Sequence, residues 1–186
     1  ADGSTAERFA WADSKLCAPA VADLDGDGQA ELYVGSGAYA RQLSRIDRGA
    51  DGRWRRSQVM AQIDRISSDI TGLASADLDG DRREELIVAL GPWRAYDLRI
   101  LRGGPDGAVE QLARKTVGFV SALALVRVGA EVWIAAAKYD EHASANRFSP
   151  SAPYGPPAGI YLFALRDRQI VEVGYFANPG RPRYEL

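Results

Sequence analysis

Short apolar runs alternate with compact polar segments along the chain, and the clearest of these runs frame two acidic segments. The runs "CAPAVA" (17–22) and "ELYVGS" (31–36) flank the first, and "TGLASA" (71–76) and "ELIVAL" (85–90) flank the second. They are too short for helices, contain β-branched residues and are bounded by glycine, which is typical of strands. Each acidic segment is therefore predicted to be the turn of a β-hairpin.

The acidic segments themselves predict cation binding. They read "DLDGDGQAEL" (23–32) and "DLDGDRREEL" (77–86). Like charges about 5 Å apart repel by roughly 3 kcal/mol per pair at an effective dielectric near 20. A curled loop with four carboxylates is therefore stable only around a cation, and all-oxygen ligands at flexible spacing suit calcium better than zinc.

Two other interpretations compete with cation binding for these segments. An EF-hand requires flanking helices and a Glu at position twelve, but Val34 and Val88 stand there and the last acid comes at position nine. Solvated turns are the second alternative, because Asp and Gly are ordinary turn residues. Two copies at matched places favour calcium, in a structural role, over that alternative.

Aligning the two acidic segments shows a repeat of about fifty residues, the size of a propeller blade of four strands. A third copy begins at "SALALVRVGAEVWIAAAKY" (121–139), where the hairpin is kept and the acidic loop is lost. The predicted fold is all-β, with three propeller blades of four antiparallel strands in this chain. The blade boundaries follow: 14–64 for blade 1, 65–116 for blade 2, and 117–178 for blade 3 with a loop insertion at 139–157. Residues 4–13 are interpreted as the outer strand of a preceding blade.

The segments "PAVADLDGDGQAELYVGSG" (19–37) and "ASADLDGDRREELIVALG" (74–91) resemble the FG-GAP/VCBS repeats of integrin α-type β-propellers. The resemblance implies a calcium-binding propeller with two calcium sites, each built from acids at positions one, three, five and nine and the carbonyl at position seven. Carried over, the metal residues are Asp23, Asp25, Asp27, Gln29 and Glu31 in the first loop, and Asp77, Asp79, Asp81, Arg83 and Glu85 in the second. One departure is that Arg82 stands where the first loop has Gly28, and a non-glycine in a left-handed conformation costs about 1 kcal/mol.

A candidate ligand face is predicted at the end of the blades opposite the acidic loops. Tyr39, Trp93 and Tyr139 hold the same place in the three copies, after the second strand, and the insertion that follows Tyr139 carries the only histidine, His142. Long loops in compact domains are often functional. Packing between repeats remains the alternative for the aromatic residues, and a solvated turn remains the alternative for His142.

Composition narrows the function. A net charge of −2 over 186 residues argues against nucleic acid as the main partner, and the longest apolar stretch, 117–137, is interrupted by Arg127 and Glu131, so no membrane span is expected. No Walker loop or G-x-S-x-G elbow is found. The predicted function is a calcium-stabilised propeller module that recognises a glycan or a protein, in a secreted, periplasmic or cell-surface location. The alternative is a subunit or fragment of a propeller enzyme of the lyase or hydrolase type.

Three blades would leave an open arc, since propellers need at least four. The sequence therefore predicts a partner that closes the ring, which is either a second copy of this chain or a second polypeptide. We favour the second polypeptide, because residues 4–13 are interpreted as a strand of a blade that the chain does not otherwise contain.

Overall fold

The computed structural model describes residue 10 and residues 15–17, 19–37, 41–60, 69–91, 95–104, 108–139 and 158–177, without the side chains of residues 60 and 139. These residues form three four-stranded antiparallel sheets, and no helix is found among them. Sheet 1 contains β1 (Ala20–Ala22), β2 (Glu31–Gly35), β3 (Leu43–Arg48) and β4 (Trp54–Met60). Sheet 2 contains β5 (Ile70–Ala76), β6 (Glu85–Leu90), β7 (Asp97–Gly103) and β8 (Val109–Thr116). Sheet 3 contains β9 (Phe119–Val128), β10 (Glu131–Tyr139), β11 (Gly159–Arg166) and β12 (Gln169–Ala177).

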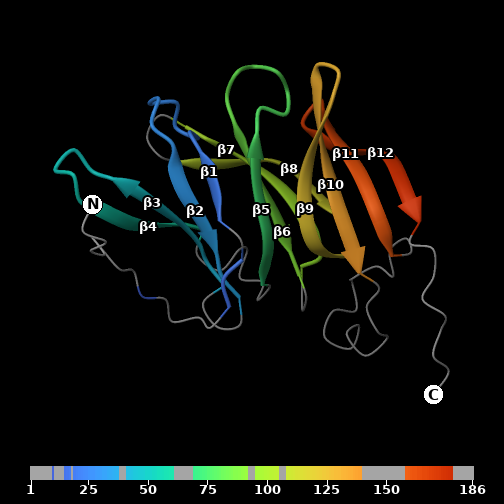
Figure 1. Cartoon of the computed structure of the whole chain (residues 1–186), viewed down its shortest axis with the longest axis horizontal. Coiled ribbons are helices and arrows are strands. Elements are labelled where there is room, and N and C mark those ends of the chain that lie inside the picture. Colours follow the sequence, from blue (N-terminus) through green and yellow to red (C-terminus); the bar gives the residue numbers. More distant parts are fainter. Residues whose placement is uncertain are drawn as a thin grey trace, which may run out of the picture.

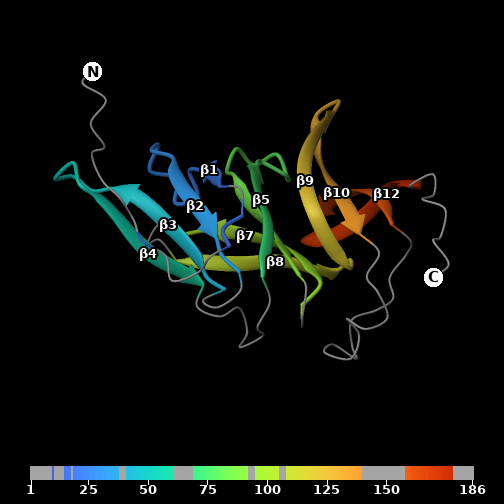
Figure 2. The same cartoon turned by 60° about the horizontal axis from the view of Figure 1, so that its bottom comes forward.

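The sheets stand side by side in chain order, with sheet 1 and sheet 3 at the two ends (Figure 1). Within each sheet the strands are ordered as in the sequence, so every connection joins neighbouring strands. The first strands are neighbours, because β1 contacts β5 and β5 contacts β9. Figure 2 shows the three sheets fanning out from this line of first strands. The all-β prediction of four-stranded, blade-like sheets is confirmed, and no sheet of the described chain closes on itself.

The core consists of two apolar layers between the sheets. Sheets 1 and 2 enclose one cluster, to which Tyr33 of β2 and Leu86 of β6 belong. Sheets 2 and 3 enclose the other, which includes Ile87 of β6 and Ile134 of β10. Because successive side chains of a strand point to opposite faces, β6 supplies both layers and all of its residues are buried. This explains why its sequence, "ELIVAL", is a continuous apolar run after the glutamate.

A register shift recurs in the three sheets between the third and the fourth strand. The pairing of the third with the fourth strand slips between Leu43 and Ser44 in sheet 1, between Ile100 and Leu101 in sheet 2, and between Leu162 and Phe163 in sheet 3. Such β-bulges bend a strand and increase its right-handed twist. The repeat is therefore visible in the irregularities of the sheets as well as in their strand order.

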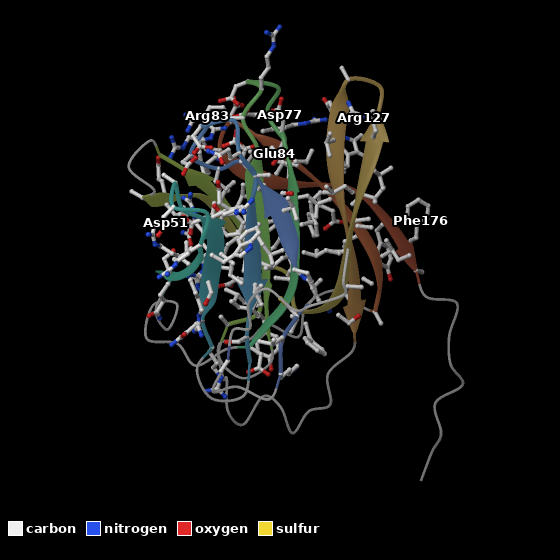
Figure 3. The ribbon with its side chains drawn as sticks, turned by 60° about the vertical axis from the view of Figure 1, so that its left-hand side comes forward. Asp51, Asp77, Arg83, Glu84, Arg127 and Phe176 are labelled. Atoms are coloured by element: carbon white, nitrogen blue, oxygen red, sulfur yellow. The ribbon has the colours of Figure 1, made fainter. Side chains whose placement is uncertain are left out.

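The two outward faces of the stack differ. On sheet 1, Ile46 and Ser44 are buried, and Arg56 donates hydrogen bonds to the Ser44 hydroxyl and to the Ala10 carbonyl oxygen. On sheet 3, the face away from sheet 2 exposes large apolar side chains. We call this the outer face of sheet 3, and its exposed members are Val126 (38%), Val128 (39%), Ile160 (47%) and Phe176 (61%). Figure 3 shows Phe176 directed away from the rest of the molecule.

The predicted blade boundaries stay a prediction, although each sheet lies within the range assigned to it. The third hairpin has the shortened form expected, since a two-residue turn at Gly129 and Ala130 joins β9 to β10. Most of segment 4–13 and the insertion after Tyr139 lie outside the described residues.

Close approach between sheets 1 and 2 requires glycine at position 103. A Cβ on Gly103 would come within 2.3 Å of the Leu24 carbonyl oxygen and 2.6 Å of its carbonyl carbon. Both are backbone atoms, which cannot rotate away. We expect Gly103→Ala to lower the free energy of unfolding by about 1–3 kcal/mol, as overpacked cores do. Urea denaturation of both proteins measures the difference.

Gly104→Ala is the matched control for this substitution. The nearest atom to a Cβ at position 104 is the Ala108 carbonyl oxygen at 3.7 Å, which is an ordinary contact. This variant should retain the stability of the wild type. Equal stability of the two alanine variants would contradict the close packing of Leu24 on β7.

Candidate metal sites

The first acidic loop is folded around the carboxylate of Asp23. Its Oδ1 accepts hydrogen bonds from the backbone N–H groups of Gly26 (2.8 Å) and Asp27 (3.1 Å), and its Oδ2 accepts one from Gly28 (2.9 Å). Gly26 and Gly28 have φ values of 76° and 86°, which glycine adopts at no steric cost. The alternation of acids and glycines therefore produces a curled loop in which the acids face inward.

A buried leucine anchors this loop to the core. Leu24 is 2% exposed and belongs to the apolar layer between sheets 1 and 2, and Leu78 holds the same position in the second loop and packs into the layer between sheets 2 and 3. The second residue of each "DLDGD" segment thus points into the core, while its acidic neighbours point away from it.

Four carboxylates converge in the first loop. Asp23, Asp25, Asp27 and Glu31 each offer an oxygen within 4.8 Å of the others. Glu31 is buried, and this burial raises its pKa, although Arg45 acts in the opposite direction. Arg45, on β3, lies 2.8 Å from an Asp25 oxygen and 3.3 Å from a Glu31 oxygen. The described residues thus place four negative charges together, with one guanidinium against two of them.

The second loop repeats the same backbone arrangement. Asp77 accepts hydrogen bonds from the backbone of Gly80 (2.7 Å) and Arg82 (2.9 Å). Arg82 has a φ of 70°, in the left-handed region that Gly28 occupies in the first loop. This position therefore has a left-handed backbone in both loops, the condition under which a non-glycine residue is costly.

The carboxylates of the second loop converge less completely. Asp77, Asp79 and Glu85 offer oxygens within 4.8 Å of one another, and Asp81 does not belong to this group. Glu85 is fully buried, which raises its pKa, while a hydrogen bond from the Leu78 N–H (2.9 Å) and the contact with Arg102 lower it. The second loop therefore brings together three of the four predicted acids.

The two predicted carbonyl ligands lie within the loops. The Gln29 N–H donates to Asp27 (2.7 Å), and the Arg83 N–H donates to Asp81 (2.9 Å). The Arg83 side chain turns away and donates to the Gly103 carbonyl oxygen (2.6 Å). Coordination by the carbonyl groups of Gln29 and Arg83 stays a prediction.

Sequence analysis missed a glutamate–arginine pair that occurs in each sheet. Glu31 pairs with Arg45 at 3.3 Å, Glu85 contacts Arg102, and Glu131 lies 3.4 Å from Arg166. Each glutamate begins the second strand of its sheet, and each arginine is on the third strand. Arg102 and Arg166 stand in similar segments, "LRGG" (101–104) and "LRDR" (165–168), and this similarity could have indicated that they are equivalent. Pairing them with the glutamates also required the strand register, which the sequence does not show.

The two acidic loops are joined to each other. Glu84, in the second loop, accepts a hydrogen bond from the backbone N–H of Asp23 (3.1 Å), and Ser75 of β5 donates to the Val21 carbonyl oxygen of β1 (2.6 Å). Figure 3 shows Asp77, Arg83 and Glu84 at the same end of the molecule, with Arg127 of β9 nearby. Order in the first loop is therefore coupled to sheet 2.

Most residues of the predicted ligand face are not among those that the structure describes. Tyr39, Trp93 and His142 are not among the described residues, and Tyr139 is described only as the last residue of β10. Their role in binding stays a prediction.

Sheets of four sequential antiparallel strands, stacked as a fan with acidic hairpin loops, define a propeller-like repeat architecture. In agreement with this class, residues 23–88 match the sequence family of FG-GAP-like repeats. This region covers both acidic loops. No curated protein matches the chain. Within the described ranges, no helix is long and apolar enough to cross a membrane.

Proposed function

We propose that this chain is a calcium-stabilised section of a β-propeller that serves as a binding module for a glycan or a protein. The observation that carries the proposal is the convergence of four carboxylates within 4.8 Å in the first loop. The match to FG-GAP-like repeats at residues 23–88 supports it.

Calcium fits the first loop on charge and on ligand type. Arg45 contacts Asp25 and Glu31 and leaves the carboxylates of Asp23 and Asp27 to repel each other. Calcium prefers six to eight oxygen ligands in flexible geometry, and a curled loop of carboxylates with a backbone carbonyl supplies them. A dissociation constant of about 0.1–1 mM is expected, as for extracellular modules, which favours a secreted, periplasmic or cell-surface location.

The role proposed for calcium is structural. The ion would hold the β1–β2 turn closed, and the loop would then present Leu24 to the core and the Asp23 N–H to Glu84 of the second loop. Calcium at this site would therefore stabilise the packing of sheet 1 on sheet 2.

A further sheet is proposed to continue the stack beyond sheet 3. The residue two places after the repeated glutamate is Tyr33 in sheet 1 and Ile87 in sheet 2, and both are at most 1% exposed beneath the next sheet. In sheet 3 this residue is Trp133, opposite the exposed Val126. We favour a second polypeptide over a second copy of this chain as its source, because Ser44 and Ile46 on the outward face of sheet 1 are already buried, and the exposed apolar residues of that face, Val21 and Trp54, lie apart on its first and last strands.

The ligand face is tested through Trp93. Once a glycan-array screen has identified a ligand, Trp93→Ala is expected to weaken its affinity at least tenfold, because stacked aromatic anchors commonly contribute more than 1 kcal/mol. The melting temperature should change little. Calorimetric titration of both proteins makes the comparison.

Trp54→Ala is the matched control, since Trp54 is an exposed tryptophan at the start of β4. It should retain full affinity. A Trp93→Ala variant that binds as the wild type does but melts much earlier would assign Trp93 to packing between repeats and remove it from the ligand face.

A further inference from the structure

The second acidic loop already contains a cation of its own, the guanidinium of Arg102. Arg102 lies on β7 directly opposite Glu85 of β6. Its Nη2 is 2.6 Å from an Asp79 oxygen, its Nη1 is 3.2 Å from an Asp81 oxygen, and its Nε donates to Glu85 at 3.0 Å. One side chain therefore contacts three of the four acids that would ligate a metal ion, in charge-assisted bonds.

The first loop lacks this arrangement. Arg45 lies opposite Tyr33, which is two residues beyond Glu31 on the same face, and reaches two acids of the loop. There the four carboxylates still converge, whereas Asp81 has left the group in the second loop and pairs with Arg102. The two loops share a backbone arrangement, but they differ in the positive group that neutralises the charge of their carboxylates.

Charge around the second loop points the same way. Arg82 and Arg83 follow Asp81 directly, where the first loop has Gly28 and Gln29. The side chain of Arg102 contacts the acids of the second loop, and Arg82 and Arg83 add two positive charges to the loop that the first loop lacks. A divalent ion among the same oxygens would meet the guanidinium at contact distance, and the repulsion between them opposes binding.

The third sheet shows that the pair persists without a metal loop. Between β9 and β10 only a two-residue turn remains, yet Glu131 still lies 3.4 Å from Arg166 and accepts a hydrogen bond from the Trp133 indole (2.7 Å). The glutamate at the start of the second strand therefore has an arginine partner whether or not acids surround it.

We infer that Arg102 is the resident cation of the second acidic loop and that this loop takes no calcium. The inference rests on the proposed function for its contrast with the first loop. The two loops then have different roles: calcium stabilises the closed form of the first, and Arg102 neutralises the second at any calcium concentration. Calcium would govern the order of sheet 1 and leave sheet 2 formed.

Titration calorimetry with calcium chloride tests this on the whole chain. We expect one binding event in the wild type, its loss in Asp27→Asn, and its retention in Asp81→Asn. Arg102→Gln removes the guanidinium from the second loop and should add a second calcium-binding event. Calcium should bind this loop at least tenfold more tightly in the variant than in the wild type. Circular dichroism and thermal melting verify that each variant is folded.

Arg82→Gln is the charge-matched control, because it removes one positive charge beside Asp81 and leaves Arg102 in place. It should still show one event. Two events in the wild type, or a single event lost in Asp81→Asn and kept in Asp27→Asn, would overturn the inference.

The failure of the proposed function is a separate outcome. No binding in the wild type would remove calcium from the first loop, and a binding event gained in Arg102→Gln would then still support the inference about the second. If Arg102→Gln does not fold, Asp27→Asn decides, because any remaining calcium binding in that variant would belong to the second loop and contradict the inference.

Discussion

Chelation of calcium is expected to lower the melting temperature of this chain by about 3–10 °C relative to the protein in 10 mM calcium. One site with a dissociation constant near 0.1–1 mM contributes about 1.4–2.7 kcal/mol at that concentration, and a domain of this size shifts by about 2–4 °C per kcal/mol. The cause is the release of repulsion among Asp23, Asp25, Asp27 and Glu31 in the first loop. Differential scanning calorimetry in calcium and in EDTA measures the shift.

Asp27→Asn should abolish most of the calcium-dependent shift. The substitution removes the charge of a predicted metal ligand that does not pair with Arg45 among the described ion pairs. The loop should therefore lose affinity for calcium while its other contacts change little. Asp51→Asn is the matched control, because Asp51 is an exposed acid of sheet 1 that pairs with Arg55 at 2.8 Å, away from the loop. Identical melting of the wild type in calcium and in EDTA would show that the first loop does not take calcium in this range.

The chain alone is expected to self-associate through the outer face of sheet 3. Val126 and Ile160 are 38% and 47% exposed, and Phe176 lies opposite Ile160 on β12. An apolar sheet face of this kind is normally covered, and in its absence it promotes association. Sedimentation velocity across a concentration series should show species larger than a monomer, and the apolar dye ANS should bind.

The double variant Val126→Glu and Ile160→Glu should shift the chain to a monomer and greatly reduce dye binding. Both side chains are already partly exposed, so the free energy of unfolding should change by no more than about 1 kcal/mol. Gln58→Glu adds charge to an exposed position of β4, in sheet 1, and should leave association unchanged. A wild-type monomer that binds no ANS would mean that the outer face needs no partner.

The strands and the acidic turns could be predicted because their signals are local. Apolar runs such as "ELIVAL" and turn residues such as Gly26 and Gly28 act within a few residues of chain, and the structure has strands and a curled loop where they occur. The glycine at the matching place in the first loop marked position 82 as one where a left-handed backbone would be costly, and Arg82 does have a φ of 70°.

The partners of the acids could not be predicted in this way. Arg102 lies 17 residues from Glu85 and reaches it through the β6–β7 register. Arg45 reaches Glu31 although it lies opposite Tyr33, because a long side chain can lean along a strand. Which arginine neutralises which acid thus depends on cross-strand geometry that no short motif encodes.

The bulges between third and fourth strands affect how the molecule behaves in a crowded solution. The fourth strands β4, β8 and β12 are rim strands, and each could in principle template a strand from another molecule. A bulge beside each rim strand twists it and interrupts the regular spacing of hydrogen-bonding groups that such a template requires. We therefore expect contacts between molecules to form through the exposed apolar face of sheet 3, where association ends once that face is covered, in place of open-ended growth along the strand edges into fibrils.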